Sequence, residues 1–177
     1  MSDEDFANRH FKHASDIIPI ILDAASSDMC IAAACYPEKH PESASVEEDL
    51  KYLKLKADTG VHFFITQMFF DNQKFLQFRE AARAHGIQTP ITAGIMPITS
   101  VKQIGTSIQL SGSSVPTELS NLFAKYGDSP EDMKKAGIDY AIRQIQELIE
   151  NEVDGIHLYT MNKSDVTKEI FGQVKPQ

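Results

Sequence analysis

The chain has no tryptophan, only two cysteines and no long apolar run. A membrane-spanning helix needs about 20 apolar residues, so we expect no membrane partner. The first residues, MSDEDFANRHFKH, lack the apolar stretch of a secretory signal. Cys30 and Cys35 form neither a Cys-x-x-Cys motif nor a disulfide framework, and we expect two buried thiols in a reducing compartment. These absences predict a cytoplasmic protein.

Positive charge is also scarce in this sequence. Lysine and arginine number 17 against 25 acidic residues, which gives a formal net charge of −8. Because proteins bind nucleic-acid backbones through basic side chains, we expect no nucleic-acid partner. A chain of 177 residues with 42% hydrophobic residues can bury a core of its own. We expect a polar tail over residues 1–14 and a single domain over residues 15–177.

Short apolar runs alternate along the chain with longer amphipathic segments. Such runs are typical of strands that are buried on both faces. Strands separated by helices indicate βαβ units and a parallel sheet, so the predicted fold class is α/β. The predicted strands cover residues 30–34, 63–66, 91–95 and 155–159.

The amphipathic segments have recognisable helix starts. Ser45 with Glu48, and Ser100 with Gln103, match the capping box. In this motif the side chain of each of the two residues accepts a hydrogen bond from the backbone N–H of the other. Ser129 stands before a proline and an acidic first turn, an order that favours a helix N-terminus. The predicted helices begin after residues 45, 71, 100 and 129, and a shorter one covers residues 17–25.

Polar side chains gather where the apolar runs end. The first run gives way to Tyr36, Glu38, His40 and Glu42 in a turn that contains two prolines. Because the carboxyl ends of parallel strands meet at one edge of a sheet, four polar strand ends predict one shared pocket. Two alternatives stay open for this turn: a metal cluster, which lacks the spacing of helical zinc sites, and a purely structural role.

Five segments, in this order, resemble the second half of the methylenetetrahydrofolate reductases: AACYPEKHPES, GVHFFITQMFFDN, ITAGIMPITS, GIDYA and DGIHLYTMN. The resemblance runs from about residue 15 to about residue 171. It implies four βα units that are equivalent to the C-terminal half of a (β/α)8 TIM barrel. It also implies a flavoprotein of one-carbon metabolism and methionine biosynthesis. Such enzymes pass a hydride from NADH or NADPH through FAD to 5,10-methylenetetrahydrofolate.

The resemblance gives FAD four candidate binding residues. Tyr36 matches the tyrosine that lies against the flavin, and His40 matches the histidine that contacts it. Asp49 and Lys56, on the helix that follows, match positions that hold the ribityl and phosphate portion. No metal ligand is implied.

The resemblance also implies three residues that bind the folate substrate. Gln67 matches the glutamine that touches the nicotinamide donor and the folate in turn. Tyr159 matches a tyrosine near the folate. Lys163 stands where relatives commonly have arginine, so its grip on a folate carboxylate would be weaker.

Nothing before Cys30 resembles the family's first half, which carries the catalytic glutamate, so no catalytic residue is assigned. Four strands cannot close a barrel, and open strand edges invite aggregation. We therefore expect a homo-oligomer, or a second chain, to complete the barrel. The isolated chain is predicted to be weakly active or inactive. The alternative is a non-catalytic flavin- or folate-binding remnant or subunit that acts with a partner.

Overall fold

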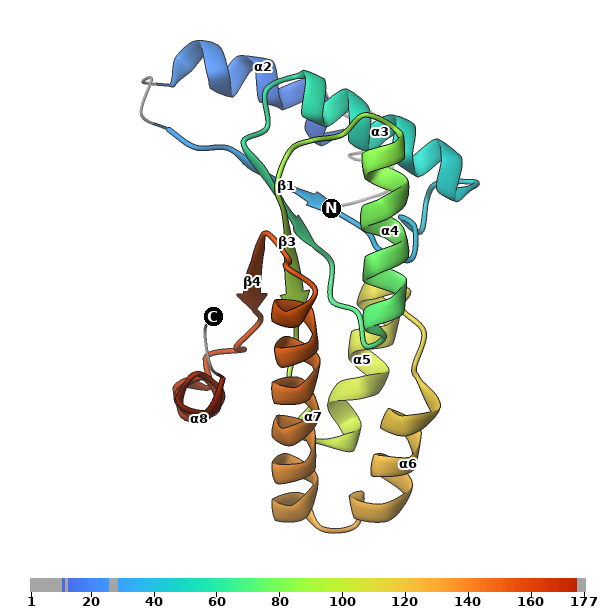
Figure 1. Ribbon diagram of the computed structural model, residues 1–177, viewed down its shortest axis with the longest axis vertical. Helices are drawn as coiled ribbons and strands as arrows, with labels where there is room; N and C mark the ends of the chain where they lie inside the picture. Colours follow the sequence, from blue (N-terminus) through green and yellow to red (C-terminus); the bar gives the residue numbers. More distant parts are fainter. Residues whose placement is uncertain (1–10, 12, 26–28, 175–177) are drawn as a thin grey trace.

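The computed structural model describes residues 11, 13–25 and 29–174 (Figure 1). Helices and strands alternate through most of this part of the chain, and an extra helix pair precedes the last strand. In chain order the elements are α2 (Ala14–Ala24), β1 (Ala32–Cys35), α3 (Val46–Asp58), β2 (Phe63–Thr66), α4 (Asn72–Ala84), β3 (Ile91–Ile95), α5 (Val101–Ser111), α6 (Thr117–Tyr126), α7 (Pro130–Glu150), β4 (Gly155–Leu158) and α8 (Ser164–Gln173).

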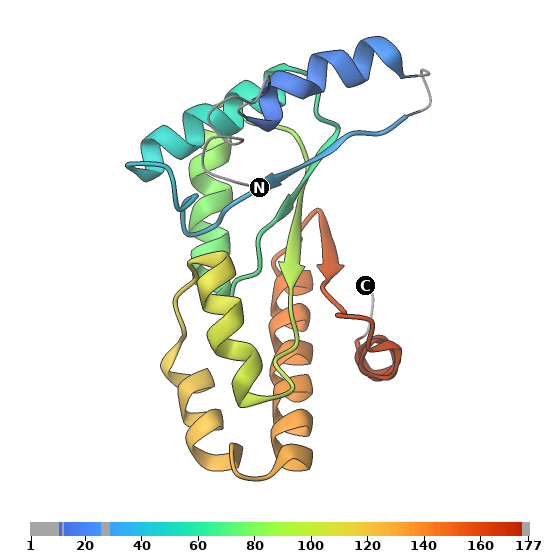
Figure 2. The same ribbon diagram turned by 180° about the vertical axis from the view of Figure 1, so that it is seen from behind.

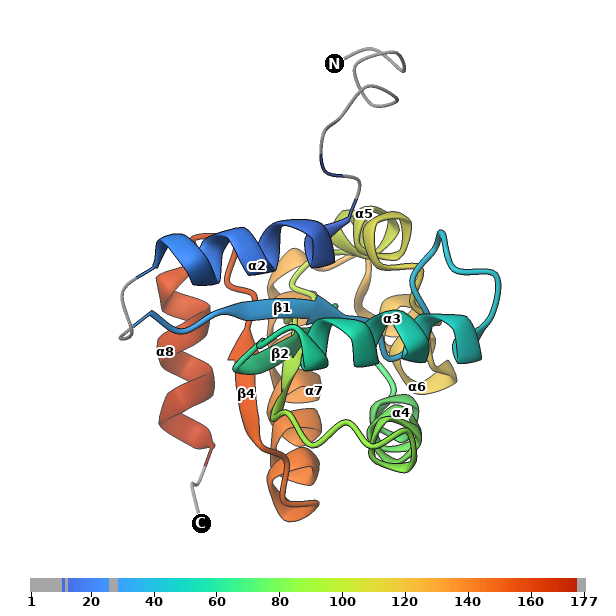
Figure 3. The ribbon, with the colours of Figure 1, turned by 90° about the horizontal axis from the view of Figure 1, so that it is seen from above.

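The four strands form one parallel sheet in the order β1-β2-β3-β4. Helix α7 contacts β3 and also packs against α4, α6 and α8. Figure 1 shows α4 and α7 on one side of the sheet, whereas the reverse view in Figure 2 shows β3 and β4 with no helix in front of them. Helix α2 packs on α3 and runs beside β1 (Figure 3).

The two faces of the sheet differ in burial. Phe64 and Ile91 are fully buried and belong to the main core beneath the helices. On the other face, Ala32 is exposed, and Phe63 and Ile65 are only partly buried. The parallel register pairs Ala32 with Phe63, so these side chains share that face. An apolar face left partly uncovered is what a half barrel presents in place of a closed interior.

The parallel four-stranded sheet with helices between its strands confirms the predicted fold class. Two strands have the predicted bounds, while the first is shifted to Ala32–Cys35 and the last ends at Leu158. Helix α2 begins at Ala14, earlier than the predicted residue 17. Most of the predicted tail over residues 1–14 lies outside the described residues. No helix was predicted where α6 lies.

Two local predictions were wrong. Ser100 is the N-cap residue of α5, but its side chain makes no capping hydrogen bond. Gln103 Oε1 instead accepts from the backbone N and the Oγ1 of Thr99, at 3.0 and 3.2 Å, because the amide reaches one residue further back. Cys30 is exposed, since it precedes β1 and lies outside the core, whereas Cys35 is buried.

Candidate functional site

The turn that follows β1 is anchored to helix α3. Asp49 accepts two hydrogen bonds from it, from His40 N to Oδ2 and from Ser43 Oγ to Oδ1, each at 3.1 Å. The rings of Tyr36 and His40 meet edge to face, with centroids 4.5 Å apart. The start of α3 is itself fixed, because Ser45 Oγ accepts from the backbone N of the third helical residue at 3.1 Å. Two aromatic rings are therefore held at the carboxyl end of the strand.

Lys56 approaches the same strand end from the far end of α3. Its Nζ donates to the carbonyl oxygen of Ala34 and lies 5.9 Å from the ring centre of Phe64. Burial lowers the pKa of Lys56 below its ordinary value, although the neighbouring Cys35 and Asp49 oppose this. Burial likewise raises the pKa of Tyr36, and the charge of Asp49 raises it further. Both groups thus lie in a partly desolvated pocket where charge interactions are strong.

These residues line a cavity of about 240 Å³. The structure therefore brings together all four residues that the resemblance assigned to FAD: Tyr36, His40, Asp49 and Lys56. The part of the wall at the start of α2 was not predicted, because residues 13–15 carry no motif and reach the cavity only through packing of α2 on α3. The other lining residues are His13, Ala14, Ser15, Ala34, Glu42, Ser43, Glu48 and Tyr52.

The three residues predicted to bind folate follow β2 and β4 in the chain, and they do not line this cavity. Gln67 follows β2, and its Oε1 accepts from the backbone N of Met68 at 3.0 Å. Lys163 donates from Nζ to Thr99 Oγ1 at 2.8 Å, which places it beside the segment after β3. The carboxyl edge of the sheet thus carries two groups of polar side chains, one at β1 and one along β2–β4.

Tyr159 reaches across β3 to the neighbouring strand. Its hydroxyl donates to the carbonyl oxygen of Thr66 at 2.9 Å. The ring passes over Gly94, where an added Cβ would lie 2.8 Å from Tyr159 Cε2. Burial raises the pKa of Tyr159, so its phenol stays a neutral donor.

Glu38 has a structural partner. Its carboxylate accepts from Ser114 Oγ at 2.6 Å and from Ser114 N at 3.1 Å, which ties the turn after β1 to the loop between α5 and α6. In the part of the chain that the structure describes, no group of three or more His, Cys, Asp or Glu side chains is placed to hold a metal ion. Nor is any helix there long and apolar enough to cross a membrane.

A parallel four-stranded sheet with helices between its strands, and with polar side chains along the carboxyl edge, defines an α/β protein built from βα units like those of half a β/α barrel. Comparison with known proteins identifies the family. The family model for methylenetetrahydrofolate reductase matches residues 1–175, so the chain belongs to the methylenetetrahydrofolate reductase family.

Relatives from bacteria and yeast are similar over most of this chain. It is 33% identical to 5,10-methylenetetrahydrofolate reductase of Escherichia coli over 158 residues, which cover 89% of the chain and 53% of that protein. It is 32% identical to methylenetetrahydrofolate reductase 1 of Schizosaccharomyces pombe over 161 residues, 91% of the chain and 27% of that protein. The chain therefore spans about half the length of the bacterial relative and about a quarter of the yeast one.

A solved structure shares the fold. It is an uncharacterized protein from Clostridium thermocellum that binds two copies of 5-methyl-5,6,7,8-tetrahydrofolic acid. The TM-score is 0.61, with 20% sequence identity, over 89% of this chain and 56% of that chain. At this identity the likeness shows the fold alone.

Proposed function

We propose that this chain forms the flavin- and folate-holding half of a cytoplasmic methylenetetrahydrofolate reductase. The observation that carries the proposal is the cavity that gathers Tyr36, His40, Asp49 and Lys56 at the end of β1. At about 240 Å³ it is smaller than the usual small-molecule pocket of about 300–1,000 Å³. It therefore fits part of a flavin nucleotide, and the remainder would extend along the strand ends.

Each residue has a distinct part in holding FAD. Tyr36 and His40 offer aromatic surface to a ring system. Lys56 supplies a cation for a phosphate group. Asp49 acts as a positioning residue, because both of its oxygens accept hydrogen bonds from the turn. FAD, when bound, would supply the hydride chemistry, taking a hydride from NADH or NADPH and giving it to 5,10-methylenetetrahydrofolate in one-carbon and methionine metabolism.

The residues after β2 and β4 are proposed to orient the folate. Gln67 has an amide nitrogen that can donate to a heterocycle while its oxygen is held by the backbone. Lys163 provides a point charge for a carboxylate. Tyr159 links the carboxyl ends of β4 and β2 through its hydrogen bond to Thr66.

The described part of the chain contributes four strands, and a closed barrel of this type has eight. We therefore propose that a second chain, or a second copy of this one, covers the partly exposed face of the sheet. The isolated chain should show weak or no turnover. A non-catalytic flavin- or folate-binding subunit is the second candidate. One observation favours this second candidate. Asp49 is the single carboxylic acid among the seven candidate residues, and both of its oxygens already accept hydrogen bonds from the turn, so it is not placed to act as a catalytic acid.

Titration of the purified chain with FAD tests the binding site. Lys56→Met should weaken FAD binding about tenfold or more, because a charged contact to phosphate is lost. Lys51→Met is the matched control, since Lys51 lies on the same helix with its side chain 70% exposed. Absence of FAD binding by the parent chain, or equal loss in both variants, would overturn the assignment of this cavity.

Turnover separates the two candidate functions. The chain is assayed with FAD, 5,10-methylenetetrahydrofolate and either NADH or NADPH, while light scattering reports its oligomeric state. FAD binding with no turnover in any oligomeric state supports the non-catalytic subunit. Turnover that appears only in an oligomer, or after a partner chain is added, supports the reductase with a completed barrel.

A further inference from the structure

The loop between α5 and α6 joins the chain after β1 to the chain after β2. Ser114 donates to the carboxylate of Glu38 from Oγ at 2.6 Å and from its backbone N at 3.1 and 3.2 Å, so both carboxylate oxygens accept. The preceding residue, Ser113, is buried, and its Oγ donates to the carbonyl oxygen of Met68 at 2.7 Å. These two serines, which we call the serine bridge, therefore connect two strand ends through consecutive residues.

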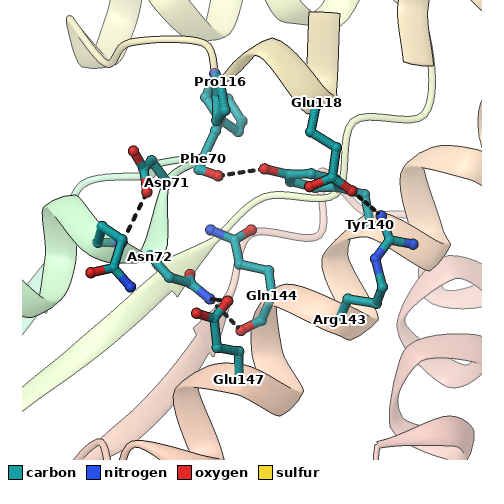
Figure 4. Close-up of a pocket in the computed structure, with 10 residues that line it drawn as sticks. Phe70, Asp71, Asn72, Pro116, Glu118, Tyr140, Arg143, Gln144 and Glu147 are labelled. Atoms are coloured by element: carbon teal, nitrogen blue, oxygen red, sulfur yellow. Dashed lines mark hydrogen bonds and ion pairs between the residues drawn. The ribbon is translucent and has the colours of Figure 1, made fainter. Parts of the chain in front are cut away.

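The β2 side of the serine bridge is a rigid anchor. Three consecutive carbonyl oxygens there accept hydrogen bonds from side chains, those of Met68, Phe69 and Phe70. The first bond comes from the serine bridge, and the other two come from α7, from Gln144 Nε2 at 3.1 Å and from Tyr140 Oη at 2.6 Å. Figure 4 shows the bond from Tyr140 to the carbonyl oxygen of Phe70. Because each carbonyl is held by a side chain, this segment can serve as a fixed reference for the bridge.

The serine bridge is itself fixed by the end of α5. Gly112 is the C-cap residue of α5 and has a φ of +68°, a left-handed conformation that glycine adopts without strain. Its backbone N donates to the carbonyl oxygen of Ile108 at 2.8 Å. The backbone N of Ser113 donates to Ser111 Oγ at 3.1 Å, and both serines are buried. Local hydrogen bonds therefore set the direction in which Ser114 leaves the helix.

The β1 side of the serine bridge holds a strained turn. Lys39 has a φ of +79°, in the left-handed region that is uncommon for residues with a side chain. Such a conformation persists only where the surrounding structure holds it. Glu38, which precedes it, is held by Ser114, and His40, which follows it, donates from its backbone N to Asp49 Oδ2 at 3.1 Å. Loss of the serine bridge would remove the contact that holds the turn on the Glu38 side.

The two segments that the bridge connects carry residues proposed for the two reactants. Tyr36 and His40 lie on the turn that we propose to contact the flavin, and Gln67 lies on the segment that we propose to contact the folate. The sheet joins these segments at their bases, where Gln67 N donates to the carbonyl oxygen of Cys35 at 2.7 Å. The serine bridge joins them again beyond the strands. Hydride transfer requires reacting atoms about 3–3.5 Å apart, so a second tie is placed to set that separation.

We propose that Glu38, Ser113 and Ser114 are positioning residues of the reductase site. They act through the turn of Tyr36 and the segment of Gln67, and they set the distance between the flavin ring and its hydride partner. This inference rests on the proposed function, because it gives the serine bridge a part in that same site.

Amide hydrogen exchange of the ligand-free chain, followed by NMR, tests whether the bridge holds the turn. Ser114→Ala should speed exchange of the hydrogen-bonded amides of His40 and Ser43 by at least about threefold, while the amides of α7 keep their rates. Ser114→Thr keeps the hydroxyl and should restore the parent rates. Ser120→Ala is the matched control, since Ser120 is an exposed serine on α6. Equal rates in Ser114→Ala and Ser120→Ala would overturn the proposal.

Titration with FAD tests the positioning role. Ser114→Ala and Glu38→Gln should each weaken FAD binding about three- to tenfold, and the double variant should bind no more weakly than either, because both changes remove one contact. Glu150→Gln, which changes an exposed acid on α7, is the control for the charge and should have no effect. Stacking on Tyr36 quenches flavin fluorescence, so at saturating FAD the bound flavin should be brighter in Ser114→Ala than in the parent chain.

Failure of this proposal can be told apart from failure of the proposed function. If the parent chain binds FAD, and Ser114→Ala binds it with the same affinity and the same fluorescence, the positioning role is wrong and the FAD site stands. Additive losses in the double variant would also contradict the positioning role, because they would mean that the two residues act separately. If the parent chain does not bind FAD, the proposed function fails and the positioning role fails with it.

Discussion

Gly94→Ala tests the close packing that seats Tyr159 at the carboxyl edge of the sheet. The added Cβ would lie 2.3 Å from the carbonyl oxygen of Thr66 and 2.8 Å from Tyr159 Cε2. Both distances are far below van der Waals contact. The Thr66 oxygen belongs to the backbone of the adjacent strand and cannot rotate away, so the strands must separate or the tyrosine ring must leave.

The cost follows from these two contacts. Inserting a carbon into a packed interior costs about 1–3 kcal/mol, and loss of the hydrogen bond from Tyr159 to Thr66 adds about 1 kcal/mol. We therefore expect Gly94→Ala to lower the free energy of unfolding by about 2–4 kcal/mol. For a domain of this size that corresponds to a fall in Tm of roughly 4–16 °C. Urea unfolding and thermal melting, both followed by circular dichroism, measure these quantities.

Gly105→Ala is the matched control, because the chemical change is the same and no heavy atom lies within 4 Å of its added Cβ. As an exposed helical position it should gain about 0.5–1 kcal/mol. Tyr159→Phe should lose only the hydroxyl bond, about 1 kcal/mol. If Gly94→Ala were as stable as Gly105→Ala, the packing of Tyr159 across β3 would be refuted.

Three further predictions use other parts of the fold. Gly137→Ala should destabilise by at least about 1–3 kcal/mol in the same urea assay, since its Cβ would lie 1.8 Å from the Ile98 carbonyl oxygen. A backbone carbonyl and Glu47 raise the pKa of His85 in the folded protein. The contribution of these contacts to the free energy of unfolding is therefore fully present below about pH 6.5, the unfolded pKa, and is lost as pH rises through the higher folded pKa. NMR titration should show a lower pKa of His85 in Glu47→Gln. Cys30 should react with a thiol reagent in the native protein, while the buried cysteine should react only after unfolding.

The strands could be predicted where the local signals agree with the tertiary structure. The runs at residues 63–66 and 91–95 are apolar and rich in β-branched or aromatic residues, and their observed bounds match. Helix α7 could also be predicted, because Ser129 Oγ accepts from Asp132 N in the cap that the sequence indicates. Helix α6 has no such signal. Its N-cap residue is Pro116, which offers no side-chain acceptor, and its burial of Leu119 is known only from the folded structure.

The candidate site also contains residues that the sequence could indicate and residues that only the folded structure brings together. The four residues proposed to bind FAD lie on a turn and one helix, within 21 positions from Tyr36 to Lys56, so a motif and its spacing could indicate them together. Tyr52 and His13, which line the same cavity with ring centroids 6.2 Å apart, could not be predicted. Their contribution depends on how α2 lies over α3, and that angle is set by tertiary packing.

The position of Gln67 shows why a motif at a strand end is an incomplete description of a site. The residues that follow it, Phe69 and Phe70, accept hydrogen bonds from Gln144 and Tyr140 of α7, which lie 75 and 70 positions later in the chain. The placement of α7 in turn requires a glycine where the helix crosses the backbone after β3. The segment after Gln67 is therefore positioned in part by side chains of α7. The side of the sheet that we propose to bind folate therefore depends on a helix that contributes none of the proposed contacts.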